Sequence, residues 1–260
     1  MYRFVAAAVL GLSTVAMSGC LQLEQTLTLE KDLSGKAGFA MNLDMESLVP
    51  IMATVKKSME GKSGAPTAAE LAEARTEVVG THKSNIRDVE KDKLEFERQL
   101  PPGVKLLDLQ AKDDGLKVAA NFLVGFDQVS KLSQIRFPKN SERGERPDAM
   151  GTNPVDSPFG ALKVVADGQT ILVTTPVTNP LAEEEEKVSQ APLDAALTGV
   201  IQQLFNGVHI VFRITSPFEV LEHNAHRREG PTLIWDYDFA KIQKMTSEQM
   251  NAGIRVKYRK

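Results

Sequence analysis

The chain of 260 residues contains one cysteine, Cys20, and few aromatic residues, 6% of the total. A single cysteine excludes an internal disulfide, so the hydrophobic core has to stabilise the domain. The scarcity of aromatic side chains disfavours a carbohydrate-stacking surface. A formal net charge of −3 argues against a nucleic-acid partner, because such proteins need a basic face. No apolar run reaches the roughly 20 residues of a membrane-spanning helix.

The motifs of several enzyme classes are also missing. No glycine-rich turn precedes a Lys-Ser or Lys-Thr pair, as a phosphate-binding loop requires. There is no Gly-x-Ser-x-Gly elbow, and the many carboxylates show no spacing that selects a glycosidase pair. A cysteine nucleophile is excluded if Cys20 is modified. We therefore expect a protein that is not an enzyme and that carries no cofactor and no metal.

The N-terminus has the order of a secretory signal peptide: a short cationic segment, an apolar run from Phe4 to Ala16, and small residues before a cysteine. Met17-Ser18-Gly19-Cys20 resembles the lipobox of bacterial lipoproteins, with methionine where leucine is usual. The resemblance implies cleavage after residue 19 and a thioether-linked diacylglycerol on Cys20. Ordinary secretion with a free Cys20 and an uncleaved N-terminal anchor are the alternatives.

Acylation would hold the protein firmly at a membrane, because two or three acyl chains on one cysteine bind stably. Leu21, rather than aspartate, follows the cysteine, and in Gram-negative lipoproteins this points to the outer membrane, facing the periplasm. Residues 1–19 contain one arginine and no acidic residue, so their removal leaves 30 basic and 34 acidic residues and a net charge of −4. Residues 20–260 are long enough for one large domain or two small ones, and we expect a single domain.

Alternation of apolar and polar residues predicts hairpins along most of this domain. The first runs from Leu21 to Leu43 through the turn Asp32-Leu33-Ser34-Gly35. Strands are also expected between residues 86 and 124, with a turn at Asp113-Asp114-Gly115, and in residues 162–174 across Asp167-Gly168. Further strands are predicted in residues 208–214, 218–221 and 233–237. The fold class is therefore α+β, with a mainly antiparallel, hairpin-connected sheet and helices packed on one side.

The predicted helices form an insertion near residues 44–79 and two later segments, the first of which is a short helix over residues 127–132. Asp44 is the expected N-cap of the first helix, and Thr67 with Glu70 forms a capping box for the second. Pro192 opens a helix that ends near Phe205. Residues 138–158 and 180–190, the latter containing Glu183–Glu186, are expected to be exposed loops. The last six residues, 255–260, are expected to be a basic tail, either solvated or touching anionic lipid.

Four histidines could serve as a general base: His82, His209, His223 and His226. His209 lies in an apolar strand, which favours a structural role. Glu222-His223-Asn224-Ala225-His226 would suit a metal only if it were helical, and its flanking residues indicate a hairpin loop instead. Trp235 is expected to anchor the sheet.

Two segments resemble the LppM-like family of bacterial envelope proteins. One is the cysteine with the strand and turn that follow it, and the other is residues 214–220 with Asn224 and residues 232–235. The resemblance implies a membrane anchor joined to an α+β domain that binds a lipid-like or glycolipid ligand, or an envelope partner. The alternatives are a structural or assembly lipoprotein without a small-molecule site and a hydrolase built on a His/Asp pair.

Overall fold

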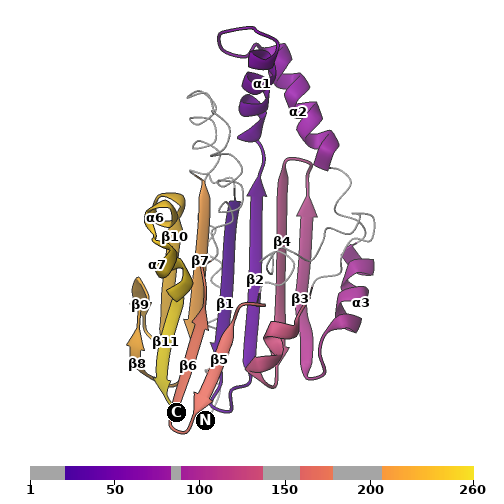
Figure 1. The fold of residues 1–260 in the computed structure, drawn as a ribbon. Coiled ribbons are helices and arrows are strands. Elements are labelled where there is room, and N and C mark those ends of the chain that lie inside the picture. Colours follow the sequence, from indigo (N-terminus) through magenta and orange to yellow (C-terminus); the bar gives the residue numbers. More distant parts are fainter. Residues whose placement is uncertain (1–20, 83–88, 137–158, 178–206) are drawn as a thin grey trace, which may run out of the picture.

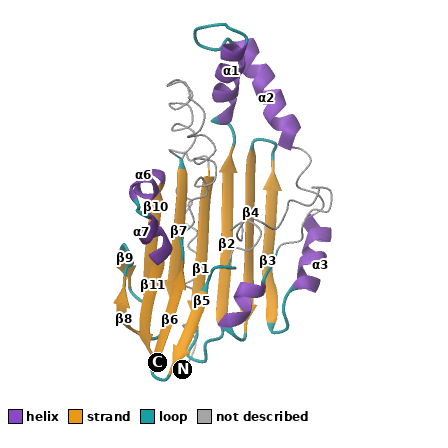
Figure 2. Cartoon of the chain, viewed as in Figure 1, coloured by secondary structure: helices purple, strands orange, loops and turns teal. Residues whose placement is uncertain are grey.

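A computed structural model describes residues 21–82, 89–136, 159–177 and 207–260. The strands form two sheets, which are shown in Figure 1 and, coloured by secondary structure, in Figure 2. The larger sheet has seven strands in the order β3-β4-β2-β1-β7-β10-β9, and the smaller has four in the order β5-β6-β11-β8. Their bounds are β1 Leu21–Leu29, β2 Gly35–Asp44, β3 Val104–Asp113, β4 Lys117–Phe126, β5 Lys163–Asp167, β6 Thr170–Thr175, β7 Val208–Thr215, β8 Glu219–His223, β9 Arg227–Glu229, β10 Thr232–Asp238 and β11 Ile254–Arg259.

Strand β1 lies in the middle of the seven-stranded sheet. It pairs antiparallel with β2, where Leu21 faces Leu43, and parallel with β7, where Leu21 faces Val208. Its alternation places Leu23, Leu27 and Leu29 in the core, because successive side chains point to opposite faces of a sheet. We call the two ends of this sheet the Leu21 end and the Leu29 end.

The main core lies between the two sheets. Trp235 of β10 is fully buried from the larger sheet, and Ile171 of β6 and Val256 and Tyr258 of β11 are fully buried from the smaller one. Trp235 is therefore an anchor of the sheet, as expected. The predicted α+β class with mainly antiparallel strands is confirmed, and the strands divide into two sheets in contact.

Helices α1 (Leu48–Met59) and α2 (Ala68–His82) form a hairpin that projects beyond the Leu21 end (Figure 1). The predicted capping box is present, because Thr67 N donates to Glu70 Oε2 at 2.6 Å and Glu70 N donates to Thr67 Oγ1 at 3.3 Å. The predicted N-cap of α1 was wrong. Asp44 ends β2 and accepts from Glu46 N, while Ser47 occupies the cap position.

The remaining helices are short. They are α3 Val89–Gln99, the 3-10 helix η1 Val129–Gln134, α6 Phe239–Lys244 and α7 Ser247–Ala252. Helix α3 corrects the expectation that residues 86–124 return to strands throughout. Its Phe96 is buried against Phe122 of β4, with ring centroids 5.7 Å apart, so a helix covers this part of the sheet.

The C-terminal segment also corrects a prediction. Instead of a basic tail, residues 254–259 form β11, an inner strand that pairs with β6 and β8. Ile254, Val256 and Tyr258 enter the core, while the basic residues between them face outward. The predicted loops at 138–158 and 180–190 and the predicted helix from Pro192 to Phe205 lie outside the described residues. Within the described part of the chain, no helix is long and apolar enough to span a bilayer.

Candidate functional site

A polar surface forms on the outer face of the larger sheet, across β1, β7, β10 and β9. In β7, Ile210 and Ile214 point into the core, so His209 and Arg213 point outward. In β10, Trp235 and Tyr237 are buried, and Asp236 and Asp238 lie on the outer face. The strand register brings these outward side chains together. His209 is paired with Asp238 across β7 and β10, so Asp236 lies diagonally beside it.

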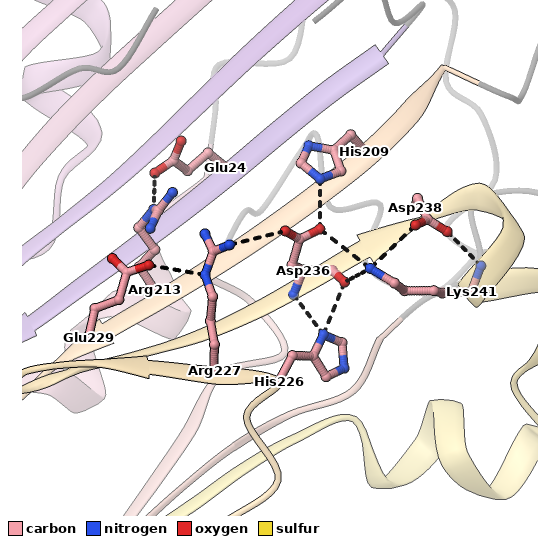
Figure 3. Close-up of polar contacts among 9 residues, drawn as sticks. All are labelled: Glu24, His209, Arg213, His226, Arg227, Glu229, Asp236, Asp238 and Lys241. Atoms are coloured by element: carbon pink, nitrogen blue, oxygen red, sulfur yellow. Dashed lines mark hydrogen bonds and ion pairs between the residues drawn. The ribbon is translucent and has the colours of Figure 1, made fainter. Parts of the chain in front are cut away.

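His209 and Asp236 form the central contact of this surface (Figure 3). Their atoms Nε2 and Oδ1 are 2.7 Å apart, and the side chains are 22% and 26% exposed. An ionised carboxylate only accepts hydrogen bonds, so the histidine Nε2–H is the donor. Lys241 Nζ donates to the Asp236 carbonyl at 3.0 Å and lies 3.8 Å from Oδ1. Arg227 Nη1 is 4.0 Å from Oδ2.

These contacts lower the pKa of the Asp236 carboxyl below its ordinary value. Partial burial raises this pKa, but the hydrogen bond and charge of His209, with smaller contributions from Lys241 and Arg227, outweigh it. The carboxylate is therefore held in its charged form. It accepts a hydrogen bond from His209 and lies within ion-pair distance of Lys241 and Arg227.

His226 and His223 are held by the backbone. His226 Nδ1 lies 3.0 Å from both the carbonyl oxygen and the nitrogen of Asp236, and its ring meets the Tyr237 ring edge-on with centroids 4.8 Å apart. His223 Nδ1 accepts from Ala225 N at 3.1 Å. The two histidines do not share a ligand site, and the described residues contain no cluster of three or more metal-ligating side chains. The segment from His223 to His226 was predicted to be a hairpin loop. It instead connects the two sheets, because β8 belongs to the smaller sheet and β9 to the larger one.

Two further ion pairs complete the surface in Figure 3: Arg213 Nε with Glu24 Oε1 at 2.8 Å, and Arg227 Nε with Glu229 Oε1 at 3.2 Å. Carboxylates and cations thus neutralise each other. The nine residues drawn include no serine, threonine or cysteine, so the His209–Asp236 pair has no nucleophile among them. A Ser–His–Asp arrangement for hydrolysis would need one within hydrogen-bond reach of the histidine.

A second candidate site lies at the Leu29 end. It is a shallow hollow of about 390 Å³ with mainly apolar walls, which include Leu107 and Phe126. Lys36 of β2 and Lys105 of β3 both line it, and both pair in register with Gly125 of β4, which lies between them. Glycine has no side chain, and the Leu107 side chain lies over Gly125 between the two lysines, since a Cβ there would be 3.5 Å from Leu107 Cδ1. The remaining lining residues are Glu30, Ser34, Gly35, Gly103 and Asp127.

This hollow combines apolar surface with two lysines that form no ion pair within the described residues, although Glu30 also lines it. The ammonium groups of Lys36 and Lys105 form no ion pair with any residue in the described ranges, whereas Asp127 is paired with Lys131 at 2.8 Å. Leu107 is 49% exposed because the register between β3 and β4 shifts at this residue. Such a combination suits a ligand with an anionic group and a short apolar part.

The predicted acylation site, Cys20, lies outside the described residues. Its neighbour Leu21 is the first residue of β1. Because Gln22 pairs with His209, the polar surface begins at the same end of the sheet as the predicted anchor. The hollow is at the opposite end, beyond the nine residues of β1 and roughly 27 Å away at about 3.3 Å per residue.

Sequence reasoning missed the His209–Asp236 pair and the two lysines of the hollow. The alternation that placed His209 in a strand also placed it on the outer face. The partner could not be found from this pattern, because the pairing of β7 with β10 depends on the register between them. Lys36 and Lys105 are 69 positions apart in the chain, and only β4 brings them to one row of the sheet.

The fold is thus an α+β domain of two packed, mainly antiparallel sheets with a charge-paired outer surface. No family model and no curated protein matches the chain. Among solved structures, it is similar to the folded domain of LppM from Mycobacterium tuberculosis, with 10% sequence identity and a TM-score of 0.41. The alignment covers 93% of this chain and 90% of that one. The likeness concerns the overall arrangement of the elements only.

Proposed function

We propose that this protein is a lipid-anchored, non-enzymatic protein of the bacterial cell envelope. In this proposal Cys20 carries the acyl chains, and the domain faces the periplasm from the outer membrane. One observation carries the proposal: the residue after the lipobox cysteine, Leu21, is already the first residue of a central strand. Cleavage after residue 19 would therefore leave the acylated cysteine directly next to a residue that is paired with Leu43 and Val208 in the sheet.

We further propose that the domain binds an amphipathic ligand with an anionic group in the hollow at the Leu29 end. The apolar surface of Leu107 and Phe126 would contact the apolar part. Lys36 and Lys105 would contact the anionic group, because two ammonium groups without carboxylate partners can both donate to it. The polar surface is not the preferred ligand site, since its charges already compensate one another.

A structural or assembly lipoprotein is the second candidate, and the closed packing between the sheets favours it. The largest core side chains, Trp235 and Tyr258, are fully buried, together with Ile171 and Leu233. In a core filled in this way, the contacts between the two sheets are made by the protein's own side chains and not by a ligand.

The anchoring is tested by expressing the full chain and a Cys20→Ala variant and separating membranes from soluble material. We expect the unaltered protein in the membrane fraction and labelled by a radioactive fatty acid. The variant should lose the label and leave the membrane fraction. A Ser18→Ala variant, which keeps the cysteine and a small residue, is the matched control and should behave like the unaltered protein. Retention of the unlabelled Cys20→Ala variant in the membrane would contradict the proposal.

A further inference from the structure

We infer that the α1–α2 hairpin is a second membrane contact, which rests on the bilayer surface beside the lipid anchor. This inference rests on the proposed acylation of Cys20 and goes beyond it. Three features of the molecule support it: the position of Leu21, the position of the hairpin base and the length of the hairpin. The partner is a lipid surface, and the contact is made by residues 59–66 at the tip.

The chain between the proposed anchor and the sheet is very short. Cys20 and Leu21 are adjacent, so their Cα atoms are about 3.8 Å apart. Leu21 is fixed by pairing with Leu43 on one side and Val208 on the other. No linker can lift the Leu21 end away from the membrane, because the cysteine side chain and its glycerol add only a few bonds.

The base of the hairpin lies beside Leu21. The partner of Leu21, Leu43, is followed one residue later by the end of β2 at Asp44. Met45 N then donates to the Leu116 carbonyl of the β3–β4 turn at 2.7 Å. A separate apolar cluster holds both helices against this turn; it contains Met45, Val49, Ala53, Ala74, Val78, Leu116 and Val118. The direction of the hairpin is therefore set by packing against the sheet.

The hairpin is long compared with the thickness of the membrane interface. Helix α1 has 12 residues, so it is about 18 Å long. Figure 1 shows both helices extending past the end of the sheet at which β1 begins. The polar interfacial layer on each side of the hydrocarbon core is only roughly 5–8 Å thick. The hairpin is longer than this layer is thick, so with Cys20 held at the membrane the domain has to tilt, and the hairpin then lies along the bilayer surface.

The chemistry of the hairpin is compatible with this position. Met59 at the end of α1 is 84% exposed, the most exposed large apolar side chain in the described residues. The neighbouring Lys62 is paired with Glu60 at 2.7 Å, and Lys56 is paired with Glu73 at 2.8 Å. The remaining tip residues are mostly small: Gly61, Ser63, Gly64, Ala65 and Pro66. An exposed thioether on a tip with paired charges can enter the interface at low desolvation cost.

The test places a fluorophore at the tip. Full-length, acylated Met59→Trp protein is reconstituted into vesicles whose phospholipids carry brominated acyl chains, which quench nearby tryptophan. Val165→Trp is the matched control, because Val165 is also exposed (57%) but belongs to β5, which does not line the hollow and lies away from the α1–α2 hairpin (Figure 1). The native Trp235 is fully buried and contributes the same background to both proteins.

We expect brominated lipid to reduce the emission of the introduced tryptophan about twofold in Met59→Trp, as for a side chain within roughly 5–10 Å of the acyl chains. The Val165→Trp protein should keep its emission. If the Met59→Trp protein emits as strongly in brominated vesicles as in ordinary ones, the inference is overturned, while the anchor is left intact. Intact mass is measured on the same samples, and a mass without acyl chains would overturn the proposed function itself.

Discussion

Asn224, in the loop after β8, accepts a hydrogen bond of 2.8 Å from the indole Nε1–H of Trp235 in β10. The same oxygen accepts from Arg255 N at 2.8 Å, and Asn224 Nδ2 donates to the Gly253 carbonyl at 2.6 Å. One asparagine therefore joins the larger sheet to β11 of the smaller one. It also satisfies the polar atom of the largest side chain in the core.

We predict that Asn224→Ala destabilises the protein by about 2–3 kcal/mol, because it leaves the buried indole N–H and two backbone groups without their partner. Urea unfolding followed by the emission of Trp235, the only tryptophan, measures the change. Glu222→Ala, an exposed change on the neighbouring strand β8, is the control and should have little effect. Equal stability of the two variants would show that Asn224 does not join the sheets.

The contact between His209 and Asp236 predicts a pH dependence of stability. The folded pKa of Asp236 lies below its ordinary value, so the ionised carboxylate favours folding. This contribution is present above the unfolded pKa of about 3.9 and is lost as the pH falls through the folded value. Asp236→Asn should therefore cost about 1 kcal/mol at neutral pH, and the cost should shrink in acid.

Urea unfolding of both proteins between neutral and strongly acidic pH tests this prediction. Glu219→Gln is the control, because the Glu219–Arg259 pair at 2.7 Å has both side chains about 60% exposed and should contribute little. A difference between wild type and Asp236→Asn that stays constant with pH would rule out an ionised Asp236 as the source of the stabilisation.

The hollow makes a prediction about ligands. In the Cys20→Ala background, a fluorescent short-chain fatty acid should bind, and Lys36→Glu with Lys105→Glu should weaken its affinity about tenfold or more, which corresponds to about 1.4 kcal/mol. Two carboxylates in place of two ammonium groups would repel the anionic head. Fluorescence titration gives the affinities.

The control for the hollow is Lys163→Glu, an exposed lysine on β5 that does not line it. It changes the net charge in the same direction and should leave the affinity unchanged. If it weakens binding as much as the changes at Lys36 and Lys105, the fatty acid responds to overall charge. In that case the hollow is not the ligand site, and the second candidate, a structural or assembly lipoprotein, gains support.

Much of the fold could be predicted from alternation and turn chemistry. The hairpin from Leu21 to Leu43, the turn at Asp113–Gly115 and the capping box at Thr67 are local patterns, and each is present as expected. Residues 254–259 carry the same alternation, with Ile254, Val256 and Tyr258 separated by basic residues. Their charge led to the prediction of a tail, although the period of two was the signal for β11.

Other features depend on contacts between distant segments. Helix α3 is mostly charged, and its position follows from one buried side chain, Phe96, that packs on Phe122. The division of the strands into two sheets requires β7 and β8, which are neighbours in the chain, to separate at Ser216 and Pro217. The pairing of Lys36 and Lys105 across Gly125 likewise follows from register. No local pattern contains this information.

The N-terminus of the mature protein decides whether the domain is lipid-anchored. Intact mass and N-terminal peptide mass spectrometry of protein extracted from membranes report both the cleavage site and the modification. We predict that the mature chain starts at Cys20 and that this residue carries a diacylglyceryl group on its sulfur. A mature chain that starts elsewhere, or an unmodified thiol at Cys20, would contradict the lipid anchor and the orientation derived from it.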